Sequence, residues 1–71
     1  MQDYQQRVID EKKDLDAKIE RLETFIDGSA MFAELPSDEI IRLRRQVYTM
    51  RLYSEILRDR IAAFKSADQQ G

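Results

Sequence analysis

Apolar residues recur at helical spacing in the first third of the chain. Five of them follow one another at steps of seven, four, three and four: Val8, Leu15, Ile19, Leu22 and Ile26. This is the spacing of a helix that packs along one side, as in a coiled coil. The stretch is rich in Gln, Glu, Lys, Leu and Ala, and it contains no Gly or Pro. It predicts a helix over about residues 2–26, whose apolar row is interrupted by Lys12.

A longer apolar row predicts a second long helix over about residues 38–65. The row consists of Ile40, Leu43, Val47, Met50, Leu57, Ile61 and Phe64. Ser54 occupies the one polar position in this row, between Met50 and Leu57. Pro36, Ser37 and two following acids are typical of a helix start, with Ser37 as the N-cap. A second row, Ile41, Tyr48, Leu52 and Ile56, is expected beside the first.

The segment between the two long helices is short. Gly28 suits a left-handed cap at the end of the first helix. Residues 29–35 carry Met31, Phe32 and Leu35, which predicts one short helix that closes the hairpin. The expected fold is therefore all-α: an antiparallel hairpin of two long helices with a short middle helix, forming one domain over residues 1–71.

Such a hairpin has more apolar surface than one copy can bury, because the first helix can cover only one row of the second. A chain of 71 residues is also small for independent stability, and it contains neither cysteine nor histidine. Disulfides and the common zinc sites are therefore excluded, and association with further copies is the expected source of stability.

Charge and motifs limit the function. The net charge is −2, with acids dominating before Pro36 and bases dominating after it. This argues against a binder of long nucleic acids but permits a local basic pocket. No stretch suits a membrane span or a signal peptide, so a cytoplasmic location is expected. Without His, Cys or a phosphate-binding glycine loop we expect no enzyme, no cofactor and no metal site.

A few side chains with flat bodies and polar tips remain as candidates for binding. They are Tyr4, Lys18, Tyr48, Tyr53 and Arg60. Aromatic rings stack on bases, and Lys or Arg neutralises phosphates, so a pocket shared between chains could hold a small nucleotide. The alternative is that the tyrosines pack at the rim of the apolar rows and the basic side chains extend over apolar surface.

The chain resembles the phage anti-CBASS sponges, small helical proteins of the crAss-phage-related group. In the first half the resemblance lies in residues 4–11 (YQQRVIDE), residues 15–22 (LDAKIERL) and Phe25–Ile26. In the second half it lies in Leu43, Gln46, Met50, Tyr53, Ser54, Ile56, Leu57, Arg60, Ile61 and Phe64. It thus extends over nearly the whole chain.

The resemblance implies a homo-oligomer, expected to be a hexamer, in the cytoplasm of an infected bacterium. The sponges sequester cyclic dinucleotides between paired chains without cleaving them, and some also bind cyclic trinucleotides where three chains meet. By this resemblance Tyr4 stacks on a purine, Lys18 meets the dinucleotide phosphates and Arg60 helps to hold a cyclic trinucleotide. Phe64 would close the dinucleotide pocket from a second chain, and Gly28 and Ser29 would contribute backbone contacts.

A different function is compatible with the same residues. The row of Ile41, Tyr48, Leu52 and Ile56 could bind a host protein, which would make the hairpin a protein–protein interaction module. A sponge should gain thermal stability when a cyclic dinucleotide is added, whereas an interaction module should not.

Overall fold

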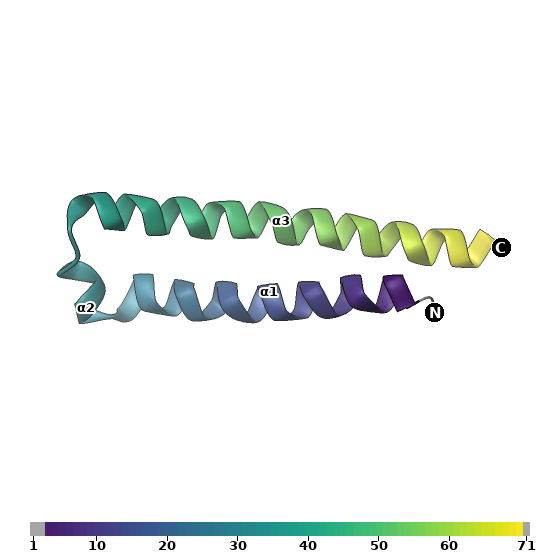
Figure 1. Cartoon of the computed structure of the whole chain (residues 1–71), viewed down its shortest axis with the longest axis horizontal. Helices are drawn as coiled ribbons and strands as arrows, with labels where there is room; N and C mark the ends of the chain where they lie inside the picture. The colour runs from purple at the N-terminus through teal and green to yellow at the C-terminus, as the bar shows by residue number, and fades with distance from the viewer. Residues whose placement is uncertain (1–2, 71) are drawn as a thin grey trace.

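The protein is a helical hairpin. A computed structural model describes the backbone of residues 3–70 and the side chains of residues 3–64. The helices are α1 (Asp3–Gly28), α2 (Ala30–Ala33) and α3 (Ser37–Gln70), with no strand in this part of the chain. Figure 1 shows α1 and α3 lying antiparallel and side by side, with α2 closing one end of a rod that measures 54 × 16 × 15 Å. The predicted all-α hairpin is confirmed.

The two long apolar rows face each other, but the core that they form is thin. Among residues 3–64 the buried ones are Val8, Ile19, Phe32, Val47 and Leu57, of which Leu57 has no exposed surface. The other members of both rows are only partly covered. Within the described residues only the short α2 adds to the two long helices, and it lies at one end, so much of the apolar surface stays in contact with water.

The polar residues that interrupt the two apolar rows, Lys12 and Ser54, both contact the Asp16 carboxylate. The Ser54 hydroxyl donates to one oxygen of Asp16 at 2.5 Å, and the Lys12 ammonium donates to the other at 2.7 Å. These hydrogen bonds, with that from Lys12 as the larger cause, lower the pKa of Asp16 below its ordinary value. The interruptions in the apolar pattern therefore form a polar contact that joins α1 to α3.

The turn differs from its prediction in three ways. Gly28 ends α1 without a positive φ. The chain instead leaves the helix at Ser29, whose extended backbone (φ −92°, ψ 127°) makes a left-handed cap unnecessary. The middle helix is shorter than residues 29–35. The helix α3 begins at Ser37, and the Pro36 carbonyl accepts from the amides of Glu39 and Ile40, so the N-cap position falls one residue before Ser37.

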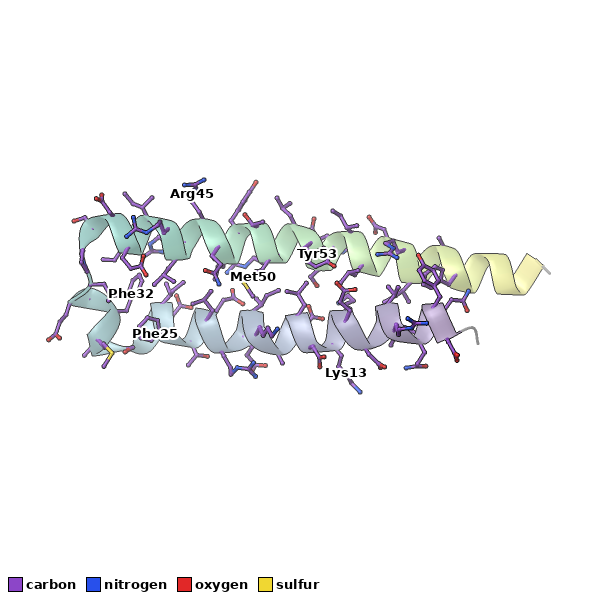
Figure 2. All side chains as sticks on the ribbon, viewed as in Figure 1. Lys13, Phe25, Phe32, Arg45, Met50 and Tyr53 are labelled. Atoms are coloured by element: carbon purple, nitrogen blue, oxygen red, sulfur yellow. The ribbon has the colours of Figure 1, made fainter. Side chains whose placement is uncertain are left out.

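The second apolar row lies on the side of α3 that faces away from α1, not beside the first row. Ile41 and Leu43 are two positions apart, and a helix turns by about 200° over two positions. Arg45, which follows Ile41 by one helical turn, points away from α1 in Figure 2. The exposed fractions are 56% for Ile41, 63% for Tyr48, 43% for Leu52 and 54% for Ile56. We call this set the outer row.

None of the helices in the described residues combines the length and the hydrophobicity that a bilayer span requires.

Candidate functional site

Three of the predicted site residues meet at the open end of the hairpin. Tyr4 comes from the first turn of α1, and Arg60 and Phe64 come from the last third of α3. The Arg60 guanidinium donates to the Tyr4 hydroxyl at 2.5 Å, and its central carbon lies 5.7 Å from the centre of the Tyr4 ring. The Phe64 ring meets the Tyr4 ring edge-on, with 5.5 Å between centroids and 64° between planes. We call these three residues the end cluster.

The end cluster presents an aromatic surface next to a positive charge. Tyr4 keeps 55% of its surface exposed although two side chains contact it. A cation–π contact and an edge-to-face contact fix the orientation of the Tyr4 ring. The side chain has therefore already lost conformational entropy before a ligand binds. An ordered exposed ring can stack on a planar base, and a guanidinium with unused N–H donors can bind a phosphate.

Lys18 lies elsewhere on the hairpin. It is 14 residues from Tyr4 on α1, which is about 21 Å along a helix. Lys18 lines a groove of about 410 Å³ together with Arg7, Asp10, Glu11, Asp14, Leu15 and Tyr53. Three acids against two bases make this lining net negative, and the Tyr53 hydroxyl donates to Glu11. A single chain therefore does not offer an anion site at Lys18, and a phosphate there would need bases from another copy.

Gly28 and Ser29 lie at the closed end of the hairpin, about 36 Å along α1 from Tyr4. The Ser29 hydroxyl accepts a hydrogen bond from the Met31 amide at 3.1 Å and so serves as the N-cap of α2. A Cβ built on Gly28 would meet no atom within 4 Å from outside its own stretch of helix, so the space on that side of the backbone is open. The predicted site residues thus occupy three separate regions of one chain, and only the end cluster is assembled within it.

Sequence reasoning did not single out a basic groove on α3. A hollow of about 450 Å³ is lined by Arg42, Arg45, Gln46, Thr49, Met50 and Tyr53. Arg42 pairs with Glu39 at 2.8 Å, whereas Arg45 has no partner among the described side chains. The signal in the sequence is the presence of three arginines within residues 42–45, which places positive charge on more than one side of a single turn.

Aromatic and charged contacts secure the closed end. Phe25 and Phe32 meet edge-on at 5.8 Å, and the Arg44 guanidinium lies 5.4 Å from the Phe32 ring. An ion pair between Arg51 and Glu23 joins α3 to α1 nearby. These groups hold α2 against the long helices, and they are engaged in the fold rather than free for a ligand.

Comparison with known proteins gives one match. Neither a curated protein nor a solved structure matches the chain. A protein-family model described as Sequestin matches residues 2–63. Because this match covers most of the chain and agrees with the resemblance to the anti-CBASS sponges, the protein belongs to the Sequestin family.

Proposed function

We propose that the protein sequesters cyclic dinucleotides, such as a cyclic GMP–AMP dinucleotide, and cyclic trinucleotides at a second site. It would hold these second messengers without cleaving them and so keep them from the CBASS effectors of an infected bacterium. The observation that carries the proposal is the match to the Sequestin family over residues 2–63, a name that denotes sequestration.

The end cluster supports a nucleotide as the ligand. Its ring is exposed and oriented, and the Arg60 guanidinium lies beside it. Stacking on an aromatic ring is worth roughly 1–3 kcal/mol per base and tolerates different bases. Tight holding without chemistry needs only such contacts, because no bond in the ligand has to break.

The separation of the site residues supports a homo-oligomer, which we propose to be the hexamer expected from the resemblance. Tyr4, Lys18 and Ser29 can contact one compact ligand only if different chains supply them. The outer row gives each chain an apolar face with which to associate. The acidic bias of α1 disfavours long nucleic acids, whereas a small anion reaches basic residues brought together by several chains.

Isothermal titration calorimetry tests the proposal. The protein is titrated with a cyclic GMP–AMP dinucleotide and, separately, with a cyclic triadenylate. Saturation at about one dinucleotide per two chains is the expected result. Chromatography of the released ligand should then recover it intact. Absence of heat with both ligands would refute the proposal.

Two substitutions of one residue localise the site. Tyr4→Ala removes a stacking surface and should weaken dinucleotide binding by about 5- to 150-fold, which corresponds to roughly 1–3 kcal/mol. Tyr4→Phe keeps the ring and loses only the hydrogen bond from Arg60, so it should bind far better than Tyr4→Ala. Size-exclusion chromatography should show the same assembly for both variants. Equal binding by both would exclude Tyr4 as the stacking residue.

The outer row favours one alternative function, binding to a host protein through Ile41, Tyr48, Leu52 and Ile56. If neither nucleotide produces heat or raises the melting temperature, a pull-down from host lysate is the next measurement. Loss of the captured protein with Tyr48→Glu would then support this alternative.

A further inference from the structure

The outward face of α3 has a pattern that reads the same in both directions. Besides the outer row, three residues lie on this face at helical spacing: Arg45, Asp59 and Ala63. The seven positions are therefore 41, 45, 48, 52, 56, 59 and 63, with steps of four, three, four, four, three and four. Leu52 is the centre of this series. Steps of three and four keep side chains on one side of a helix.

A reversed copy of the face complements the original. When the series is read backwards from position 63, Leu52 meets Leu52 and Tyr48 meets Ile56. At the next level Arg45 meets Asp59, which are of opposite charge, and at the ends Ile41 meets Ala63. A parallel copy in register would instead place Arg45 against Arg45 and Asp59 against Asp59, which is repulsive.

The side chains on this face are available for such a contact. Arg45 has no partner among the described residues, and Asp59 has only its neighbour Arg58, at 3.4 Å, with both side chains mostly exposed. The four apolar residues of the outer row are each exposed. The stretch from 41 to 63 spans about 33 Å of helix, which is enough for several turns of side-chain packing.

We propose that α3 binds α3 of a second copy, antiparallel, with the two-fold axis at Leu52. The partner is this chain itself, because the reversed copy of the face places opposite charges together and apolar residues against apolar residues. The contact places α3 between its own α1 and the partner's α3. It gives a defined interface to the homo-oligomer of the proposed function and rests on that assembly, but it does not depend on any ligand.

Cysteine cross-linking tests the direction and register of the pair, and the chain is suited to it because it contains no cysteine. Chains with Tyr48→Cys and chains with Ile56→Cys are mixed, without nucleotide, and treated with a short bismaleimide. The proposal predicts that the mixed product exceeds either self-linked product, because positions 48 and 56 face each other. Self-linking at 48 in place of the mixed product would indicate a parallel pair and overturn the proposal, as would the absence of both.

Charge reversal tests the same register without cysteine. Arg45→Asp and Asp59→Arg, made separately, each place like charges together at two points of the pair. Each should raise the dissociation constant of the assembly by about tenfold or more at low salt. The double variant restores opposite charges and should associate like the original chain. Circular dichroism should show unchanged helix content, since both side chains are exposed in the single chain. A double variant that associates no better than the single variants would overturn the register.

These outcomes are independent of the nucleotide titration. A chain that pairs as described but binds no cyclic nucleotide would refute the proposed ligand and leave the interface standing. A chain that binds the dinucleotide but gives no mixed cross-link would refute the interface and leave the proposed ligand standing.

Discussion

Leu57 and Leu52 form a matched pair for separating the core of the hairpin from its outer face. Both lie on α3, five positions apart, which turns them about 140° from each other. Leu57 has no exposed surface in the single chain, whereas 43% of Leu52 is exposed. We predict that Leu57→Ala destabilises the fold itself and that Leu52→Ala acts only on association between copies.

The expected size of the Leu57 effect follows from its burial. Replacing a fully buried leucine with alanine costs about 2–5 kcal/mol, because the lost transfer energy is added to that of the cavity left behind. A domain of this length has a total stability of roughly 4–10 kcal/mol. Since 1 kcal/mol shifts the melting temperature of such a small domain by about 4–8 °C, the midpoint should fall by at least about 8 °C.

The Leu52 effect should depend on protein concentration. In the single chain Leu52→Ala removes only part of a half-covered side chain and introduces a residue that favours helix, so the change should stay below about 1 kcal/mol. In an antiparallel α3 pair, the Leu52 side chains of both copies meet at the two-fold axis, so the substitution removes two apolar side chains from the interface. The variant should therefore melt like the original chain when dilute and well below it when concentrated.

Circular dichroism at 222 nm measures both effects in melts over a hundredfold range of protein concentration. Urea titration at the lowest concentration then gives the free energy of unfolding for each variant. A melting temperature of Leu57→Ala equal to that of the original chain would refute the assignment of Leu57 to the core. A Leu52→Ala deficit that is the same at every concentration would refute its role in association.

Three further predictions concern polar contacts. Lys12 and Ser54 hold the pKa of Asp16 below the ordinary value of 3.8, so its contribution to stability is present above that value and is lost as the pH falls through the folded pKa. Asp16→Asn should therefore make the free energy of unfolding, measured by urea titration, less dependent on pH between about pH 5 and 2. Arg60→Met should weaken binding of a cyclic triadenylate by about tenfold or more in calorimetry while the helix content stays unchanged, because charged hydrogen bonds to the phosphates are lost. Glu23→Gln breaks the exposed pair with Arg51 and should cost less than about 1 kcal/mol in low-salt melts, and nothing measurable in 1 M salt.

The sequence predicted the helices and their packing faces because both depend on local spacing. The rows that contain Val8, Ile19, Val47 and Leu57 face each other as expected. The predicted position of the outer row, beside the first row, was wrong. Helical spacing could have shown this, because Ile41 and Leu43 are two positions apart and residues at that spacing lie on nearly opposite sides of a helix. The predicted left-handed conformation of Gly28 was wrong. Glycine often adopts that conformation at the end of a helix, but here the extended backbone of Ser29 ends the helix instead.

Contacts between the helices were harder to predict, because they depend on the register of two antiparallel rows. The contact between Lys12 and Asp16 lies within α1 at a spacing of four, but neither row showed that Ser54 of α3 would bind the same carboxylate. The contact between Tyr4 and Arg60 joins residues 56 positions apart and also depends on the register.

The acids around Lys18 are a different case, since Asp10 and Asp14 precede it at steps of four on the same face of α1. Helical spacing alone could have shown that this lysine lies in a net acidic groove, because residues four apart are neighbours on a helix surface.

The α3 pair has a consequence for where a shared dinucleotide pocket can lie. Tyr4 contacts Phe64, which is 12 residues and about 18 Å along α3 from the axis at Leu52. The two Tyr4 rings of the pair therefore lie about 36 Å apart, at opposite ends, and two bases of one dinucleotide cannot stack on both. A pocket with two Tyr4 rings needs a second two-fold contact between other surfaces.

Two different two-fold contacts on one chain lead to closed dihedral assemblies, of which a hexamer is one, or to open chains. The two contacts should then be separable. Leu52→Glu places charges on the axis of the α3 pair and should reduce the assembly measured by light scattering, because like charges would be buried together. The smaller species should still bind a cyclic dinucleotide in calorimetry, since its end cluster and second contact are unchanged. Loss of binding together with loss of assembly, in a variant of unchanged helix content, would show instead that the pocket depends on the α3 pair.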